Sequence, residues 1–419
     1  MHLIHRKTCR VCGSSALSKV IDMGVQKLQG SFFKPPSSMF AERAIPLSLV
    51  RCDPSRDEKA CGLLQVEHSV PPELLYRLYW YRSGTNRTMQ GHLRGIVEEA
   101  CELRGGHCKT ALDIGCNDGT LLSFYPGDTE CVGIDPSNSL PASTDRVQYV
   151  RDFFPSVELR NALGPKKFEV ITSVAMFYDL EDPLTFTNEV RHFLAPDGIW
   201  VVEVSYMPQM LKQGSYDSIC HEHLEYYSLS TLENLFERAE LKLVRADFNG
   251  MNGGSIRCFV THQNCFEYKS DEDLMKLREI RVAEFDMELD LDRPYRLFQD
   301  GIERHRVELT RVLRDLRLAG KSIHIYGAST KGNTILQWCG IDSRLVDCAS
   351  ERNPDKWGTV TPGTEIPIVS EEESRARNPD CYLVLPWHFQ EEFLQREEAM
   401  LRRGTRFIFP LPEVRVVGG

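Results

Sequence analysis

The stretch "TALDIGCNDGTLLSFY" (residues 110–125) reads as a strand, a tight turn and the start of a helix. Its mostly apolar first part predicts a buried strand, "GCNDG" a turn, and "TLLSFY" the first helical residues. Twenty residues past Gly115, a second apolar run, "CVGID", ends in Asp135. A glycine turn that opens a helix, with a carboxylate ending the next strand, is typical of a cradle for an adenosine-bearing cofactor, whose ribose hydroxyls bind the carboxylate.

The turn itself indicates which cofactor binds. A dinucleotide site reads G-x-G-x-x-G, whereas this turn reads G-C-N-D-G, and Asp118 would repel a pyrophosphate but attract the cationic end of S-adenosylmethionine. Downstream, "VRDFF" offers Asp152 and Phe153 to hold and stack adenine, and two further strands follow in "FEVITSVAMFYDLEDP" and "FLAPDGIWVVEVSY". The order favours S-adenosylmethionine; the alternative is a Rossmann-like unit without cofactor.

Four cysteines before this unit have the pattern of a metal site. Cys9 and Cys12 form "CRVC", and Cys52 and Cys61 follow after about forty residues. Four thiolates bind Zn²⁺ tetrahedrally and leave no open position, which predicts a structural rather than a catalytic zinc. The second pair is spaced unusually widely, as though a loop were inserted, and free thiols in a metal-free lobe are the alternative.

Composition limits the partners. A chain of 419 residues predicts two or three domains, and a net charge of -10 without a basic stripe argues against nucleic acid. No apolar run approaches the ~18 residues of a membrane span, and "MHLIHRKTC" lacks the apolar core of a signal peptide. We therefore expect a cytoplasmic protein with reduced cysteines, apart from those that hold metal, and a small-molecule partner.

A second strand-turn-helix unit lies near the C-terminus. The charged stretch from Lys269 to Arg317 predicts solvated connecting helices, and "SIHIYGASTKGNTILQWCGI" then repeats the strand, small-residue turn and helix. Further strands are predicted in "CYLVLPW" and "TRFIFPLP". Exposed amides at a helix N-terminus bind anions, and Lys331 adds a positive charge there. The turn can alternatively serve only to pack its helix on the sheet.

The stretch "SICHEHLEYYS" (residues 218–228) places His221 and His223 on either side of Glu222. Residues two apart share a face in a strand or extended loop but point roughly 200° apart on a helix. The zinc-protease pattern needs histidines four apart, which this stretch lacks. The residues alone leave two interpretations open, a proton-transfer site or a structural loop whose histidines bond to backbone groups.

Several motifs together resemble one family, the S-adenosylmethionine-dependent sugar C-methyltransferases, which act on nucleotide-linked keto-deoxysugars made for antibiotics and bacterial surface polysaccharides. The matches cover nearly the whole chain in the family's order, and the set rather than any single motif carries the resemblance. Besides the paired cysteines, the matching stretches are "DMGVQKLQGSFF", "DIGCNDGTLL" with "GIDPS", "YDSICHEHLEYYSL", "NGGSIRCFV", "IYGASTKGN", "TPGTEIPI" and "FIFPLP".

The resemblance implies an α/β fold and a substrate. It predicts a small zinc-binding lobe (1–70), a class I, Rossmann-like methyltransferase domain (71–268), a helical connector (269–318) and a C-terminal Rossmann-like α/β domain (319–419) facing the methyltransferase across a sugar-nucleotide cleft. The substrate implied is a thymidine or guanosine diphosphate-linked 4-keto-6-deoxy sugar, methylated at C-3. Neither the choice of nucleotide nor the oligomeric state follows.

Methylation at carbon requires a base that removes the proton beside the ketone. The resemblance places the family's Glu-His pair on Glu222 and His223, which makes His223 the expected base and Glu222 its orienting partner or a sugar-hydroxyl ligand. His221 is the next candidate.

The chain departs from the family pattern at two positions. Cys220 replaces a tyrosine, and a histidine after the fourth strand has no counterpart. Tyr178 or Asp179 is expected to take over its task, or else Tyr79 or Tyr81.

The remaining site residues are predicted in two groups. Expected to bind the cofactor are Asp113, Gly115, Asn117, Asp118, Gly119, Thr120, Leu121, Asp135, Pro136, Asp152, Phe153 and Ser173. Expected to bind the substrate are Tyr81, Asn86, Gly327, Ala328, Ser329, Lys331 and Asn333.

Three rival functions are compatible with parts of the sequence. A sugar or small-metabolite O- or N-methyltransferase would need only a base near a hydroxyl or amine. A catalytically inactive nucleotide-sugar binding protein would explain the two departures. An NAD-dependent enzyme is least favoured, because no acidic residue clearly ends the strand after "GASTKG".

Overall fold

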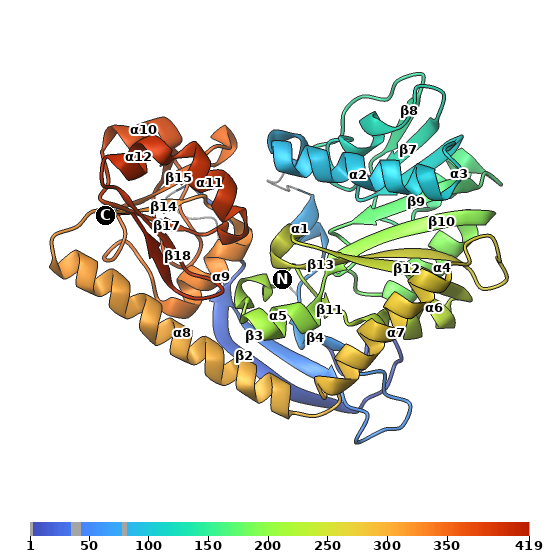
Figure 1. Cartoon of the computed structure of the whole chain (residues 1–419), viewed down its shortest axis with the longest axis horizontal. Coiled ribbons are helices and arrows are strands. Elements are labelled where there is room, and N and C mark those ends of the chain that lie inside the picture. Colours follow the sequence, from blue (N-terminus) through green and yellow to red (C-terminus); the bar gives the residue numbers. More distant parts are fainter. Residues whose placement is uncertain (1–2, 35–42, 78–81, 419) are drawn as a thin grey trace.

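The computed structural model describes residues 3–34, 43–77 and 82–418. The N-terminal strands lie below two larger lobes, the middle segment in cyan to yellow on one side and the C-terminal segment in orange to red on the other (Figure 1). Within the described ranges, no helix is both long and apolar enough to cross a membrane.

The N-terminal lobe is an antiparallel sheet that recruits a strand from later in the chain. In spatial order its strands are β11 (Glu225–Tyr226), β4 (Leu64–Val66), β3 (Ala44–Cys52) and β2 (Leu17–Lys27), and β1 (Ile4–His5) pairs separately with β5 (His68–Ser69). β11 begins two residues after His223, and its Glu225 and Tyr226 pair with Gln65 and Leu64. The loop that carries the candidate base is thus hydrogen-bonded to the N-terminal lobe, although its residues fall in the predicted methyltransferase segment.

The middle lobe is built on a mixed sheet. Its strands, in spatial order, are β12 (Leu241–Asn249), β13 (Ser255–His262), β10 (Leu194–Ser205), β9 (Phe168–Val174), β6 (Thr110–Ile114), β7 (Glu130–Ile134) and β8 (Val147–Val150). β6 pairs in parallel with both β7 and β9, so the strand order reverses at β6. Ligands bind beyond the carboxyl ends of strands at such a switch point.

The predicted strand, glycine turn and following strand are confirmed, but the helix expected from Thr120 is only a 3-10 turn, Leu121–Phe124. Tyr125 is already extended and precedes Pro126, and the residue before a proline is disfavoured in the helical region.

Helices cover both faces of this sheet. Successive side chains of a strand point to opposite faces. Accordingly Trp200 and Val202 of β10 pack with α4 (Pro183–Phe193) and α6 (Leu229–Arg238), and Val201 packs with α2 (Arg87–Leu103). The remaining helices of the first two lobes are α1 (Glu73–Tyr76), α3 (Val157–Leu163) and α5 (Met207–Gln213).

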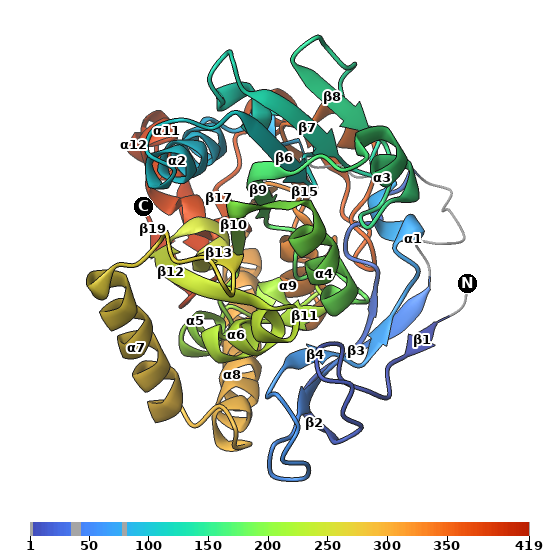
Figure 2. The same cartoon turned by 90° about the vertical axis from the view of Figure 1, so that its right-hand side faces the viewer.

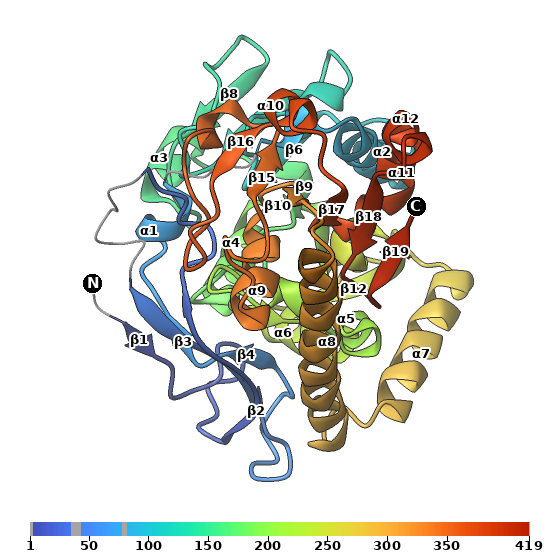
Figure 3. The same ribbon diagram turned by 90° about the vertical axis from the view of Figure 1, so that its left-hand side faces the viewer.

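Two helices connect the lobes. α7 (Asp271–Asp286) packs beside β12 (Figure 2), and the long α8 (Arg293–Leu318) runs past β2 to the C-terminal sheet (Figure 3). Tyr295, Phe298 and Ile302 of α8 share one core cluster with Leu49 of β3 and Ile325 of β14. The N-terminal and C-terminal lobes are therefore packed as one body through α8.

The C-terminal lobe repeats the parallel plan of the middle lobe. Its sheet runs β16 (Ile368–Ser370), β15 (Cys348–Glu351), β14 (Ile323–Tyr326), β17 (Cys381–Val384), β18 (Arg406–Phe409) and β19 (Arg415–Val417). Its helices are α9 (Thr330–Cys339), α10 (Glu371–Ala376), α11 (Gln390–Arg396) and α12 (Glu398–Arg402). β14 pairs in parallel with β15 and β17, so this sheet has its own switch point.

Candidate active site

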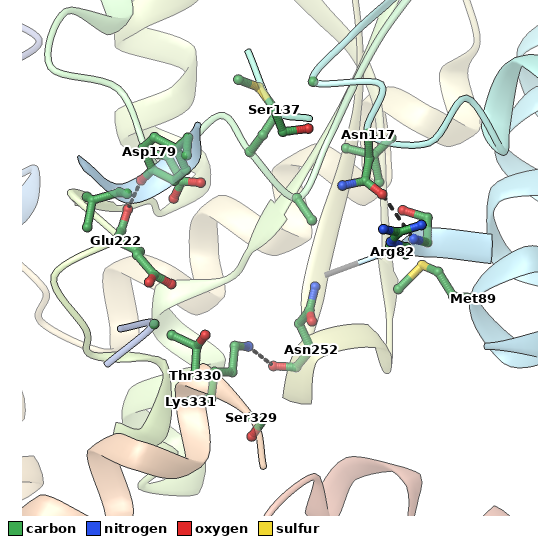
Figure 4. A pocket seen from close by; sticks show the side chains of 18 of the residues that line it. Arg82, Met89, Asn117, Ser137, Asp179, Glu222, Asn252, Ser329, Thr330 and Lys331 are labelled. Atoms are coloured by element: carbon green, nitrogen blue, oxygen red, sulfur yellow. Dashed lines mark hydrogen bonds between the residues drawn. The ribbon is translucent and has the colours of Figure 1, made fainter. Parts of the chain in front are cut away.

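A cavity of about 1230 Å³ lies where the lobes meet. It is lined by Gly30 of the N-terminal lobe, the turns after β6 and β14, the loop after β9, and part of the HEH stretch. Figure 4 shows Asp179 and Glu222 on one side of it, Asn117 on the other, and Lys331 below them with its side chain directed toward Asn252. Its volume exceeds the ~300–1,000 Å³ of single-ligand pockets, so it has room for a cofactor and a second ligand.

The turn after β6 allows a close approach of backbone to ligand. Gly115 has φ +75°, and a Cβ built there would lie 2.8 Å from Met176 Cγ. The buried Asp135 carboxylate accepts one hydrogen bond from the Asn117 amide (2.9 Å) and one from the Ser137 amide (2.8 Å), each at a different oxygen. Each oxygen keeps a lone pair, which fits the two hydroxyls of a ribose.

Most predicted cofactor residues line the cavity, namely Asp113, Gly115, Asn117, Leu121, Asp135, Pro136, Asp152 and Phe153. Others do not belong to its described lining. Asp118, Gly119 and Thr120 are three of these. The Asp118 carboxylate accepts hydrogen bonds from the Gly84 amide (2.9 Å) and the Thr120 hydroxyl (2.6 Å). Ser173 is buried under Trp200, whose indole donates to its hydroxyl (3.2 Å).

The two histidines of the HEH stretch point in different directions. The His223 amide donates to the Cys220 carbonyl (3.2 Å), which closes a turn, so the shared face expected of an extended loop does not form. His221 is fully buried, and both its amide (3.1 Å) and its Nδ1 (2.8 Å) donate to Oε1 of Gln29. His223 lines the cavity and His221 is not among its lining residues.

His223 is held as a neutral base. Its Nδ1 lies 2.7 Å from the Ser218 carbonyl oxygen, which can only accept, so Nδ1 carries the hydrogen and Nε2 keeps the lone pair. The ring stands edge-on to Tyr178, with centroids 4.5 Å apart. Burial lowers the His223 pKa to about 3, helped by the positive charge of Lys331 and opposed by the bond to Ser218.

Glu222 contacts the N-terminal lobe rather than His223. A Cβ on Gly30 would overlap its carboxylate, so any other residue at this position would displace the Glu222 side chain. Burial raises the Glu222 pKa to about 7, against the opposing effects of Lys356 and the Gly30 amide. Glu222 was expected to orient His223, but in the described part of the chain the hydrogen bond that fixes the imidazole comes from Ser218.

Asp179 is the second unusual acid of the cavity. Burial raises its pKa well above the usual range, and the neighbouring Glu222 and Glu225 add to the shift. Its Oδ1 is buried with no hydrogen-bond partner among the described residues. The Leu224 amide donates to the Tyr178 carbonyl (2.7 Å), which ties the loop of Asp179 to the loop of His223. Asp179 is therefore a buried acid that lines the same cavity as His223, in surroundings that favour its protonated form. Tyr79 and Tyr81 lie outside the described residues.

The predicted substrate residues fall into two groups. Gly327, Ala328, Ser329, Lys331 and Asn86 line the cavity. Asn86 also caps α2, where it accepts from the Thr88 amide (2.8 Å). Asn333 is fully buried and donates to the Gln29 carbonyl (2.7 Å), so it packs α9 against the N-terminal lobe.

Lys331 lies at the start of α9. Its Nζ donates to the Asn252 carbonyl (3.1 Å), and burial lowers its pKa, opposed by Asp217.

Lys356 and Asp217 are among the lining residues that the sequence prediction missed. Lys356 donates to the Ala328 carbonyl (2.7 Å), and Asp217 accepts from the Trp387 indole (2.9 Å). Lys356 lies outside the matching motifs, and Asp217 lies in the stretch "YDSICHEHLEYYSL" without having been singled out, so tertiary packing is what identifies both as lining residues.

The four predicted metal ligands converge. The Sγ atoms of Cys9, Cys12, Cys52 and Cys61 all lie within 4.8 Å of one another, with Cys9–Cys61 at 3.5 Å and Cys12–Cys52 at 3.4 Å. Four Zn–S bonds of ~2.3 Å in tetrahedral geometry would separate the sulfurs by about 3.8 Å. The cluster fits Zn²⁺.

Arg10, between two of these ligands, links the metal site to the cavity loops. Its buried guanidinium lies 3.5 Å from Glu225 and 3.4 Å from Glu181, and donates to the Val66 carbonyl (3.0 Å). Glu225 follows His223 by two residues, and Glu181 follows Asp179 by two.

Comparison with known proteins agrees with this layout. Three family models match in succession: a putative zinc binding domain over residues 9–76, a methyltransferase domain over 86–246, and a C-methyltransferase C-terminal domain over 250–412. The chain is 30% identical over 419 residues to the C-methyltransferase NovU of Streptomyces niveus, covering 98% of this chain and 96% of that protein. Human thiol S-methyltransferase TMT1B is 25% identical over 123 residues, 27% of this chain and 50% of that protein.

Solved structures of methyltransferases are similar to part of the chain. The plantazolicin methyltransferase BpumL in complex with SAH has 13% identity and a TM-score of 0.33, over 41% of this chain and 82% of its own. Magnesium protoporphyrin IX methyltransferase (ChlM) from Synechocystis PCC 6803 with bound SAH has 9% identity and a TM-score of 0.34, over 42% and 88%.

Fold and site thus define an α/β methyltransferase that uses S-adenosylmethionine, with a structural zinc in its N-terminal lobe. The chain belongs to the family of C-methyltransferases with an N-terminal zinc-binding domain. The predicted family, fold class, enzyme class and cofactors are confirmed, whereas the domain boundaries and the roles of site residues stay predictions.

Asp135→Ala is expected to weaken S-adenosylmethionine binding tenfold or more. Charge-assisted bonds to two ribose hydroxyls contribute roughly 1.5–3 kcal/mol each before compensation by water, and ~1.4 kcal/mol is a factor of ten. Calorimetry measures the change, and Asp135→Asn, which keeps one acceptor, should lose less. Unchanged affinity in a folded Asp135→Ala protein would place the cofactor in another loop.

Proposed function

We propose that the enzyme methylates C-3 of a 4-keto-6-deoxy sugar linked to thymidine or guanosine diphosphate, in deoxysugar, polysaccharide or natural-product biosynthesis. The observation that carries the proposal is the neutral His223, which lines one cavity together with Asp135 and Lys331. A base, a cofactor turn and a turn suited to phosphate are the parts that this reaction needs. We place the enzyme in the cytoplasm, where the zinc thiolates stay reduced.

His223 Nε2 removes the C-3 proton, and the C–H electron pair moves into the ketone to give an enolate. A conjugate-acid pKa of about 3 makes the imidazole a weak base in the free enzyme, and Lys331 is one cause of the lowering. A bound diphosphate beside Lys331 would neutralise that positive charge. Substrate binding is therefore expected to raise the His223 pKa toward the value that catalysis requires.

Asp179 is suited to stabilise the enolate oxygen. Burial favours the protonated form of this carboxyl group, and in that form Asp179 can donate a hydrogen bond without adding a negative charge. This assigns to Asp179 the task of the family histidine that has no counterpart. S-adenosylmethionine, when bound, supplies the electrophilic methyl group.

The proposal is tested by product analysis. The purified enzyme is incubated with S-adenosylmethionine and either the thymidine or the guanosine diphosphate-linked 4-keto-6-deoxy sugar. We expect a methyl group bound to carbon by NMR, and solvent deuterium at C-3 even without S-adenosylmethionine. A methoxy signal would indicate O-methylation, and neither product nor exchange with either sugar would contradict the substrate class.

Glu222→Gln is expected to stabilise the fold at high pH. The Glu222 pKa is raised from 4.5 to about 7, so folding favours the protonated acid, and its contribution is present below pH 4.5 and lost as pH rises through 7. At ~1.4 kcal/mol per unit, the variant should gain about 3 kcal/mol at pH 8 and less than about 1 kcal/mol at pH 5. Urea unfolding at both values measures this.

The matched control is Glu102→Gln, on an exposed position of α2. It should gain no stability between pH 5 and pH 8. Equal gains in both variants would mean that the effect is general surface charge and not the buried Glu222.

A further inference from the structure

The cavity contains two turns with the same backbone geometry. Gly115 after β6 and Gly327 after β14 have φ +75° and +84°. The Gly115 amide donates to the Ile134 carbonyl at the end of β7 (2.8 Å), and the Gly327 amide donates to the Ser350 carbonyl in β15 (2.9 Å). Each glycine thus follows the central strand of a parallel sheet, at its switch point, and bonds to the neighbouring strand.

An acidic residue comes next at both places. Asp135 follows Ile134, and Glu351 follows Ser350. The Glu351 carboxylate accepts from the Ala328 amide (3.0 Å) at one oxygen and from the Asn353 amide (2.9 Å) at the other. This is the arrangement of Asp135, in which one amide comes from the glycine turn and one from the residue two positions after the acid. As in Asp135, one lone pair remains on each oxygen.

Glu351 lines the same cavity, with only 14% of its side chain exposed. Lys356 Nζ lies 3.8 Å away and donates to the Ala328 carbonyl (2.7 Å). A carboxylate with a lone pair left on each oxygen can accept hydrogen bonds from hydroxyl groups. The expectation that no acidic residue ends the strand after the "GASTKG" turn is therefore wrong, because β15 ends in Glu351.

We propose that Glu351 binds the free pentose hydroxyls of the substrate's nucleoside, two in guanosine or one in thymidine, as Asp135 is expected to bind the ribose of the cofactor. This rests on the proposed nucleotide-linked substrate. The N-terminal amides of α9 begin at the same turn, where Ser329 caps the helix by accepting from the Gly332 amide (3.0 Å). A pentose on Glu351 would place its phosphates beside those amides and Lys331.

The test is a double-mutant cycle between the protein and the ligand. Calorimetry first identifies which of dTDP, GDP, UDP and ADP binds tightest, with NAD⁺ as a further probe. The chosen diphosphate and its analogue without pentose hydroxyls are then titrated into wild type and Glu351→Gln. We expect Glu351→Gln to weaken binding of the diphosphate about tenfold. Binding of the analogue should be equally strong in the variant and in wild type.

A matched pair of variants separates this site from the cofactor site. Glu351→Gln should leave S-adenosylhomocysteine affinity unchanged, and Asp135→Ala should leave diphosphate affinity unchanged. If Glu351→Gln does not fold, Glu351→Asp replaces it, since the shorter acid cannot reach both amides and hydroxyls.

Each other outcome overturns a definite statement. If the substitution leaves diphosphate affinity unchanged, or weakens the analogue as much as the diphosphate, Glu351 does not bind the pentose. The proposed substrate class is then unaffected. Failure of every diphosphate to bind wild type removes both. Tighter binding of NAD⁺ than of any diphosphate would assign Glu351 to a dinucleotide.

Discussion

Replacing His223 by Asn is expected to lower turnover roughly 10²–10⁴-fold, the usual contribution of a general base. Asn keeps an N–H where Nδ1 now donates to the Ser218 carbonyl (2.7 Å), so the loop should stay folded. The Asn side chain has no basic nitrogen in the position of Nε2, so it cannot take the C-3 proton. Exchange of the C-3 proton with deuterated solvent should therefore fall in parallel with turnover, while both ligands still bind.

His221→Asn is the control, since it changes the neighbouring imidazole. His221 is fully buried against Gln29, so its loss should reduce stability by about 1–3 kcal/mol and turnover much less. If the two substitutions exchange their effects, His221 is the base. If neither slows exchange, the proton is taken elsewhere, and Asp179, Tyr178, Tyr79 and Tyr81 are the next residues to replace.

The pH dependence of turnover over KM is a second test of the role of His223. With a pKa of about 3, His223 is already neutral above pH 4 in the free enzyme. The defect of His223→Asn in turnover over KM should thus persist unchanged from pH 6 to pH 8. A wild-type acid limb near pH 6.5 that disappears in His223→Asn would show that the imidazole is charged in the resting enzyme, contrary to the structure.

Local features of the fold were predictable from sequence. The apolar run before Gly115 and the run that ends in Asp135 each determine a strand, and their pairing follows from the short connection between them. The four cysteines were identified because two pairs, the first with the spacing of a zinc site, stand in a chain whose other cysteines are expected to be reduced. In these cases the necessary information lies within a few residues, where pattern and turn chemistry act.

What sequence could not supply depends on distant contacts. His221 and His223 differ only in what packs against them, and the partner of His221 is Gln29, 192 positions away. Gly30 fixes Glu222 across a similar distance. Glu351 was missed because β15 spans only Cys348–Glu351, with alanine and serine inside, so no apolar run marks the strand that this acid ends. Its equivalence to Asp135 becomes visible only when the two sheets are compared.

Removal of the zinc is expected to destabilise the protein strongly. We expect one zinc per chain, and Cys9→Ser should release it and lower the melting temperature strongly, because structural zinc binding in small domains contributes ~10–16 kcal/mol at pH 7. Metal analysis and thermal unfolding measure this, on protein purified without chelators. Cys265→Ser, outside the cluster, should keep the zinc. Wild-type protein without zinc would contradict the assignment.

The structure also predicts that this loss reaches the active site. Arg10 sits between Cys9 and Cys12 and holds Glu225 and Glu181, the anchors of the loops that carry His223 and Asp179. Removing one partner of a buried charge pair costs about 3–5 kcal/mol. These loops should therefore shift when loss of zinc displaces Arg10. The β6 turn makes no such contact in the described residues, and S-adenosylhomocysteine affinity should change little.

Arg10→Lys separates the two effects of the metal site. Lysine keeps the positive charge but lacks the fork that spans two carboxylates and the Val66 carbonyl. We expect full zinc content, near-normal cofactor affinity and a fall in turnover of tenfold or more, with C-3 proton exchange slowed to the same extent. Turnover equal to wild type would mean that the zinc lobe contributes stability alone. A fall in cofactor affinity instead would show that the lobe supports the β6 turn and not the proton-transfer loops.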